Sequence, residues 1–194
     1  MVRIGVDQGH RVSLRRVPLP TMDALDAIRH VRVIRSYAPG PIEPEKLIAI
    51  VDAGRHTGSS QNRQRWDFVL LTERPTLARL GHVGRYAAHV PGATAAIALV
   101  TPDPPAPRAA LSITWDLGRA AQNIVLAAWA LGIGSCPVTV YDHELARELI
   151  GYPEDRDCMY LITLGYPADP HDLARAPRAG GRKPLEEVLH RERW

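Results

Sequence analysis

Apolar and polar positions follow one another along the chain with two different spacings, and each spacing predicts a type of element. Apolar residues three or four positions apart indicate helices, whereas short apolar runs bounded by glycine, proline or polar residues indicate strands. The expected helices cover residues 22–30, 44–56, 75–80, 112–131 and 142–150, with a further turn or two at 184–189. The expected strands cover residues 66–71, 94–100, 135–141 and 159–164. Helices and strands alternate, but their uneven spacing does not give a regular βαβ series.

Local signals support the ends and the faces of these helices. Thr21 is the expected N-cap of the first helix, and Asp23 favours the positive end of its dipole. Pro44 suits the first turn of the second helix, and Asp142 is expected to cap the helix that ends at Ile150. The second helix is expected to turn four side chains inward: Leu47, Ile48, Ile50 and Val51.

The helix expected at 112–131 changes character half-way along. Its first half carries polar residues on one side, whereas residues 124–131 are apolar nearly all round. A helix of this kind is buried, either in a large core or against another subunit. We therefore expect a homodimer.

The composition is that of an ordinary globular chain. Of its 194 residues, 45% are hydrophobic and 23% are charged, and the formal net charge is +3. We expect one domain at residues 21–194, preceded by an N-terminal extension at residues 1–20. The modest charge argues against a nucleic-acid binder, and no apolar run is long enough to span a bilayer. Because no secretory signal is visible, a cytoplasmic protein is expected.

Several common chemistries lack their sequence signatures. The eight histidines and two cysteines show no metal-ligand spacing, and neither a dinucleotide-binding glycine motif nor a P-loop occurs. Cys136 follows a glycine-rich turn, but no histidine and acid are placed to activate it as a nucleophile. Cys136 and Cys158 stand in apolar contexts and are expected to be buried free thiols. No side chain is therefore assigned a catalytic role.

Three polar segments are candidates for binding an anionic ligand. Arg32 and Arg35 stand three positions apart at the end of the first helix, where two guanidinium groups can face one phosphate. Residues 58–66 supply small residues, hydroxyls and an amide that can bind a ring edge. Residues 180–184 add an arginine and a lysine after a Gly-Gly pair. Solvated arginines and an ordinary helix C-cap are the alternative interpretations of the first two segments.

Four segments match, in order, the motifs of one known family. Residues 31–37 (Val-Arg-Val-Ile-Arg-Ser-Tyr) stand in place of an R-R-S-x-R-x-[FY] element. Residues 58–66 (Gly-Ser-Ser-Gln-Asn-Arg-Gln-Arg-Trp) stand in place of a P-S-x-x-N-x-Q-P-W element. A long helix with Gln122-Asn123 then leads to Leu-Gly-Ile-Gly-Ser, and the ending combines Gly-Tyr-Pro at 165–167 with Arg-Lys-Pro-Leu-Glu-Glu at 182–187. In this order and spacing, the chain resembles the nitroreductase family of FMN-dependent oxidoreductases.

Four residues depart from the family pattern: Val31, Val33, Gly58 and Arg65. The two valines replace residues that often help to hold the FMN phosphate, so this role is expected to shift to Arg32 and Arg182. Gly58 and Arg65 replace two prolines, which predicts a looser turn.

The resemblance implies an α+β fold, in which a central mixed β-sheet is flanked by helices, in an intertwined homodimer. It implies FMN in the subunit interface, NAD(P)H as the electron donor, and an electron-poor small molecule such as a nitroaromatic or a quinone as the acceptor. Arg35 is expected near the pyrimidine edge of the flavin, and the Ser59-Ser60-Asn62 element is expected to come from the other subunit. The implied cofactor-binding residues are Arg32, Arg35, Ser59, Ser60, Asn62, Cys136, Pro137, Val138, Arg182 and Lys183.

A second hypothesis stands beside the enzyme. The same dimer would hold a flavin or another nucleotide as a sensor or store, without catalysis. The valines at positions 31 and 33 keep this hypothesis open. A yellow colour of the purified protein, bleached by NAD(P)H, would separate the two.

Overall fold

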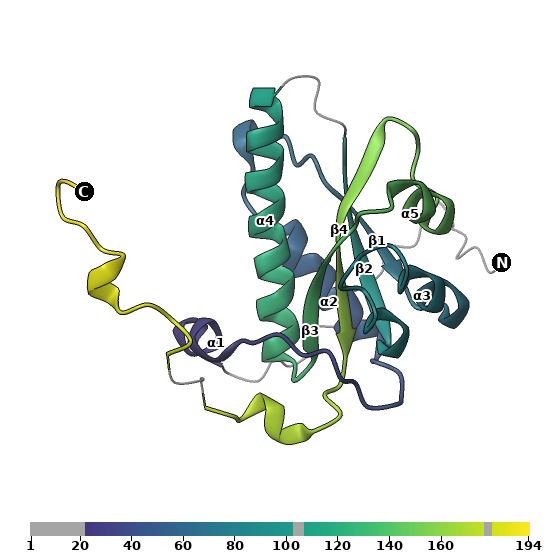
Figure 1. Ribbon diagram of the computed structural model, residues 1–194, viewed down its shortest axis with the longest axis horizontal. Coiled ribbons are helices and arrows are strands. Elements are labelled where there is room, and N and C mark those ends of the chain that lie inside the picture. The colour runs from purple at the N-terminus through teal and green to yellow at the C-terminus, as the bar shows by residue number, and fades with distance from the viewer. Residues whose placement is uncertain (1–21, 103–106, 177–179) are drawn as a thin grey trace.

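The centre of the molecule is a four-stranded sheet (Figure 1). The computed structural model describes residues 22–102, 107–176 and 180–194, so the predicted N-terminal extension and Thr21 lie outside the described residues. In spatial order the strands are β1 (Asp67–Leu71), β2 (Ala95–Pro102), β4 (Arg156–Gly165) and β3 (Gly134–Thr139). All four predicted strands are confirmed, with ends that shift by at most three residues.

The prediction of a mixed sheet is wrong for these four strands. β1 pairs with β2, β2 with β4, and β4 with β3, each time antiparallel. Parallel pairing among the described residues is limited to one bridge between Val33 and Ser135. Apolar runs such as residues 94–100 predict a buried strand but do not reveal the direction of its neighbours.

Helices cover both faces of the sheet (Figure 1). α2 (Pro44–Arg55) and α4 (Pro107–Ala130) lie on one face, and α3 (Arg74–Leu80) and α5 (His143–Ile150) on the other. Alternate side chains of β2 pack against the helices on the two faces of the sheet, because successive residues of a strand point to opposite faces. Ala95, Ile97 and Leu99 pack with α2 and α4, and Ala96, Ala98 and Val100 with α3 and α5. The predicted α+β class, with helices flanking a sheet, is confirmed.

Close contact between α2 and α4 depends on a glycine and an asparagine. A Cβ carbon at Gly54 would lie 2.8 Å from Cγ1 of Ile124, so a larger residue would force the helices apart. Asn123 donates from Nδ2 to Oγ1 of Thr57 at 2.7 Å and to the carbonyl of Ala53 at 3.3 Å. The Asn123 amide therefore fastens α4 to the C-terminal end of α2.

Two local predictions need correction. α1 spans Ala24–His30, and its N-cap is Asp23, whose carboxylate accepts two backbone N–H groups of the first turn. Ile48 is 41% exposed, although its neighbours Leu47 and Ile50 are buried as predicted. The apolar stripe of α2 is therefore narrower than its sequence indicates.

The apolar second half of α4 is buried largely within the chain itself. Ile124, Ala128, Trp129 and Leu131 are buried, and the residues between them are partly buried. Trp129 packs with Ile34 and with Ala27 of α1. This burial accounts for much of the pattern from which the sequence predicted a second subunit.

Large apolar side chains are exposed elsewhere. Leu111 and Trp115 lie one turn apart on α4 and are 73% and 71% exposed. The segment 180–194, which contains the short 3-10 helix η4 (Leu185–Glu187), is exposed throughout and extends away from the sheet and its helices (Figure 1). Its exposed apolar residues are Leu185, Val188, Leu189 and Trp194. None of the described helices has the length and hydrophobicity needed to cross a membrane.

Candidate functional site

Three of the predicted cofactor-binding residues line one cavity. The cavity has a volume of about 1200 Å³ and lies between residues 28–36, at the end of α1, and residues of the segment 172–182. Arg32, Arg35 and Arg182 all line it, together with Gly180 and Gly181. The structure therefore brings together side chains that lie about 150 positions apart in the sequence. Lys183 is exposed and follows this lining directly.

The charges in this cavity divide into paired and unpaired arginines. Arg29 pairs with Asp26 at 3.5 Å. Arg175 pairs with Asp172 at 2.9 Å and with Asp169 at 3.5 Å. In contrast, no carboxylate of the described residues forms an ion pair with the three predicted arginines. The three arginines predicted from the sequence are therefore those whose positive charge can interact with a bound anion.

Arg32 is held in place by its own chain. Its guanidinium lies over the ring of Trp129, with Cζ 5.8 Å from the ring centroid. Nε donates to the carbonyl of His30 at 3.3 Å, and Nη1 donates to the carbonyl of Ala176 at 3.4 Å. These contacts use only part of the fork of donors, and the remaining N–H groups are available to an anion.

Arg35 lies beside a second group of predicted residues. Burial raises the pKa of the Cys136 thiol, and the nearby Arg35 guanidinium, which also hydrogen-bonds the sulfur, opposes that rise. Burial lowers the pKa of His89, and the charge of Arg35 lowers it further. Nε2 of His89 is buried and has no hydrogen-bond partner among the described residues. Arg35 therefore connects the arginine cavity to strand β3.

The three predicted residues of β3 differ in their access to a ligand. Cys136 and Val138 are buried, whereas Pro137 between them is exposed. The Cys136 thiol points to the inside and approaches the carbonyl of Pro137 at 3.4 Å. Contact with a bound molecule is consequently open to Pro137, and the thiol of Cys136 is enclosed.

The predicted residues Ser59, Ser60 and Asn62 lie elsewhere in the same chain. Ser60 and Asn62 begin and end the 3-10 helix η1, and the backbone N–H of Ser60 donates to Asp116 of α4 at 2.8 Å. Trp129, beneath Arg32, is thirteen residues farther along α4 than Asp116. At 1.5 Å per residue, this separation is about 20 Å along the helix axis. In one chain, the turn and the arginine cavity thus lie at different levels of α4.

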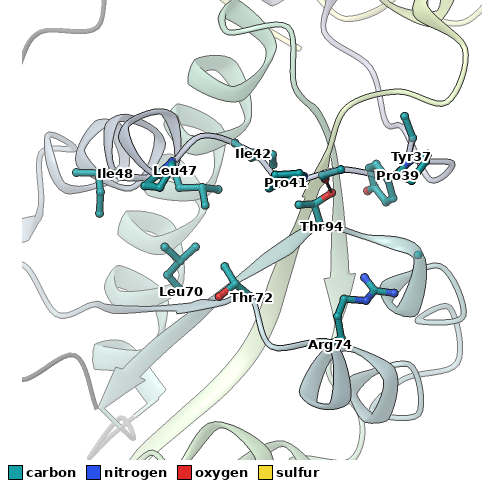
Figure 2. A pocket seen from close by; sticks show the side chains of 14 residues that line it. Tyr37, Pro39, Pro41, Ile42, Leu47, Ile48, Leu70, Thr72, Arg74 and Thr94 are labelled. Atoms are coloured by element: carbon teal, nitrogen blue, oxygen red, sulfur yellow. Dashed lines mark hydrogen bonds between the residues drawn. The ribbon is translucent and has the colours of Figure 1, made fainter. Parts of the chain in front are cut away.

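A second cavity, of about 880 Å³, lies between α2, the end of β1 and the loop 38–41 (Figure 2). Its walls are mainly apolar, with Pro41, Ile42 and Leu47 on one side and Leu70 below them. The guanidinium of Arg74 donates to two backbone carbonyls of the segment 91–93, at 2.5 and 2.6 Å. The first cavity holds three arginines without an ion pair, whereas this space holds one guanidinium that is already hydrogen-bonded, so it is the weaker candidate for an anion.

Comparison with known proteins identifies the family of this chain. A model of the nitroreductase family matches residues 28–90 and 77–166. The chain belongs to the nitroreductase family. A protein of Archaeoglobus fulgidus, provisionally named NADH dehydrogenase/NAD(P)H nitroreductase, is 33% identical over 178 residues, which cover 89% of this chain and 99% of that protein. The resemblance seen in the sequence motifs is thereby confirmed.

More distant nitroreductase relatives and solved structures agree with this assignment. An NADPH-flavin oxidoreductase of Vibrio harveyi is 26% identical over 185 residues, covering 89% of this chain and 75% of that protein. The structure of the Vibrio harveyi NADPH:FMN oxidoreductase complexed with NAD+ has a TM-score of 0.75 at 24% identity, covering 88% of this chain and 77% of that one. An FMN-dependent nitroreductase of Clostridium difficile has a TM-score of 0.74 at 21% identity, covering 88% and 99%. At these identities the two structures show the shared fold.

Proposed function

We propose that this chain is an FMN-dependent oxidoreductase, which takes electrons from NAD(P)H and passes them to an electron-poor small molecule such as a nitroaromatic or a quinone. The observation that carries the proposal is the cavity beside α1, where Arg32, Arg35 and Arg182 keep unpaired charges next to a Gly-Gly backbone. When bound, FMN would supply the redox chemistry, and the chain would supply binding, orientation and charge.

The phosphate of the cofactor would lie in this cavity. A phosphate group carries up to two negative charges and prefers the planar fork of arginine. Arg32 is already oriented by Trp129, and Arg182 follows Gly180, whose φ of +70° is a conformation that glycine adopts without strain. Arg32 and Arg182 are therefore assigned to the phosphate. They would take over the role of the family residues that Val31 and Val33 replace.

Arg35 is assigned to the flavin ring. Its guanidinium has no carboxylate partner among the described residues and lies near the enclosed thiol of Cys136 and the imidazole of His89. A positive charge at the pyrimidine edge favours the negative charge that reduction places on the ring. Arg35 would thus raise the reduction potential of the bound cofactor.

A homodimer is part of the proposal, because the second ring-binding element would come from another copy of the chain. The turn that contains Ser59, Ser60 and Asn62 lies about 20 Å along α4 from Trp129, beneath Arg32, in one chain. The exposed Leu111 and Trp115 on α4 offer apolar surface of the kind that subunit interfaces cover. Each site would then borrow residues from two subunits.

The purified protein tests this function directly. Heat-released supernatant should contain FMN rather than FAD, and addition of NADH or NADPH without oxygen should bleach the yellow colour. Protein that binds FMN but is not bleached would instead support the sensor or store. Apoprotein that takes up no FMN at micromolar concentration would reject both the FMN-dependent enzyme and a sensor or store of FMN.

A further inference from the structure

The turn between α2 and β1 has an uncommon backbone. Three of its residues have positive φ without being glycine: Gln61 and Asn62 at 54° and Gln64 at 48°. Residues with side chains rarely adopt this left-handed conformation, and it persists only where the surroundings impose it. Contacts within the turn, such as the 2.9 Å bond from the N–H of Gln64 to Oγ of Ser59, form part of these surroundings.

The remaining restraint comes from one face of α4. Ser112, Asp116 and Arg119 are spaced four and three residues apart, so they lie in one row along the helix. Oγ of Ser112 accepts a hydrogen bond of 2.7 Å from Nη2 of Arg65, at the end of the turn. Nη2 of Arg119 lies 3.2 Å from the position that a Cβ carbon would take on Gly58, at its start.

Asp116 stands at the centre of this row and holds the middle of the turn. It is 3% exposed, and its Oδ2 accepts the backbone N–H of Ser60 at 2.8 Å. Its other carboxylate oxygen lies 3.9 Å from Nη1 of Arg119. A carboxylate is costly to bury, so it is stable here only because a hydrogen-bond donor and a cation face it.

The row also explains how the turn is held without the family's two prolines. Arg65 replaces one of them and is anchored to Ser112, and Gly58 replaces the other and lies against Arg119. The turn that the sequence predicted to be loose is thus held from outside, by α4.

We propose that Asp116 is the positioning residue of the cofactor site: it fixes the left-handed turn so that Ser60 and Asn62 present their side chains to the flavin ring. This inference rests on the proposed function, because it assigns a ligand to the turn. Without the carboxylate, the N–H of Ser60 loses its partner, and the three left-handed residues of the turn relax toward right-handed conformations. The hydroxyl and the amide then leave the ring edge.

The first experiment compares Asp116→Leu, which removes the acceptor, with Asp116→Asn, which keeps an acceptor oxygen. Asp116→Leu should weaken FMN binding to the apoprotein by about 10- to 150-fold, the range expected for a hydrogen bond to a charged group. It should also change the visible spectrum and the midpoint potential of the bound flavin. Asp116→Asn should restore most of the affinity and both flavin signals, because it keeps an acceptor for the N–H of Ser60.

A matched control lies on the other face of the sheet. Asp142 caps α5, and its Oδ1 accepts the N–H of Leu145 at 2.9 Å. Asp142→Leu removes the same kind of bond and should lower thermal stability without changing FMN affinity. If both leucine variants lose FMN equally, the effect is general destabilisation and the proposal is rejected.

A readout without cofactor separates this inference from the proposed function. Arg63 and Arg65 make the turn a trypsin site, and cleavage after them should be faster in Asp116→Leu than in wild-type apoprotein. If cleavage rises but FMN affinity stays unchanged, Asp116 holds the turn but the turn does not bind the flavin, and the positioning role is rejected. If wild type binds no FMN, the proposed function and the positioning role both fall, and cleavage then reports only whether Asp116 restrains the turn.

If Asp116→Leu does not fold, the same bond can be removed from its exposed partner. Ser60 is the first residue of η1, where proline is tolerated, and Ser59 before it is extended with φ −135° and ψ 157°, as a residue before proline requires. Ser60→Pro lacks the N–H, whereas Ser60→Ala lacks only the hydroxyl. Faster trypsin cleavage and weaker FMN binding in Ser60→Pro than in Ser60→Ala are expected, and equal behaviour of the two would overturn the proposal.

Discussion

The ring of Tyr37 lies directly against Gly165, where a Cβ carbon would be only 2.5 Å from Cδ1 of the ring. The Tyr37 hydroxyl donates to the carbonyl of Ile34 and contacts Oγ1 of Thr163, each at 2.7 Å. The N–H of Ala38 donates to the carbonyl of Tyr166 at 2.8 Å. These contacts hold the segment with Arg32 and Arg35 against the end of β4. They explain in physical terms why Tyr37 and the Gly-Tyr-Pro sequence belong to the motifs.

Gly165→Ala should therefore destabilise the protein by about 1–3 kcal/mol, as expected for overpacking a filled site. Urea unfolding followed by circular dichroism measures the change. Gly92→Ala is the matched control, because nothing lies within 4 Å of its would-be Cβ carbon. This control should change stability by less than about 1 kcal/mol, and equal losses in both variants would contradict the tight contact with Tyr37.

Stability should fall at alkaline pH because of a buried thiol. Burial raises the pKa of Cys158 from 9.0 to about 12, and the neighbouring Asp157 adds to the rise. Below pH 9 both the folded and the unfolded state keep this proton, so the stabilisation is complete. Above pH 9 the unfolded state ionises first, and the free energy of unfolding drops by about 1.4 kcal/mol per pH unit up to the folded-state pKa.

Cys158→Ala should flatten this loss, measured by urea unfolding at intervals between pH 8 and 11. Cys136→Ala is a useful comparison, because burial also raises the pKa of Cys136 but the Arg35 guanidinium opposes it. A smaller flattening is expected there. Identical slopes in wild type and Cys158→Ala would show that the thiol does not control the alkaline loss.

The sequence predicted the sheet better than the site. The run at 94–100 and the cap Asp142 are local signals, and the strand and helix that they predict are present. Strand direction depends on partners far along the chain, so the prediction of a mixed sheet was wrong for the four described strands. Asp116 is one of several polar residues on one side of the long helix, and its role was not predicted, because only the fold brings Ser60, 56 positions away, to its carboxylate.

The site predictions differ in the same way. Arg32 and Arg35 are neighbours on a local segment, so their common cavity could be expected from spacing alone. Arg182 was connected to them only through the resemblance, since no local rule relates residues so far apart. The fold brings Arg182 into the cavity that Arg32 and Arg35 line, although about 150 residues separate them in the sequence.

Arg182→Ala should weaken FMN binding by about 10- to 150-fold while the dimer stays folded, because a charge-assisted hydrogen bond to the phosphate is lost. Titration of apoprotein with FMN measures the affinity. Arg175→Ala is the matched control, since Asp169 and Asp172 already neutralise that guanidinium in the same cavity. Unchanged affinity in Arg182→Ala would show that the phosphate is held elsewhere.

Arg35→Ala should act on the redox chemistry more than on binding. Loss of the positive charge should lower the flavin midpoint potential by about 30 mV or more, which for two electrons corresponds to about 1.4 kcal/mol. Reduction by NAD(P)H should slow in the same variant, while FMN affinity changes little. Arg29→Ala, whose charge is paired with Asp26, should leave the potential unchanged. An unchanged flavin midpoint potential in Arg35→Ala would show that this guanidinium does not lie beside the flavin ring.

The last prediction concerns the proposed homodimer. Trp115 is 71% exposed on α4 beside Leu111, and buried tryptophans are frequent hot spots of interfaces. Trp115→Glu should therefore weaken self-association by a factor of about 30 or more, corresponding to a loss of at least about 2 kcal/mol. Sedimentation across a concentration series measures the effect, and FMN should dissociate together with the dimer if the site needs both subunits.

Tyr141→Glu is the control for this variant. Tyr141 is also a large exposed aromatic residue, at 63%, but it precedes α5 on the opposite face of the sheet. The control should remain dimeric and keep its flavin, because it adds the same charge outside the proposed interface. A wild-type monomer of about 21 kDa that retains FMN would contradict the two-subunit site, since one chain would then hold the cofactor without a second copy of the turn at Ser60.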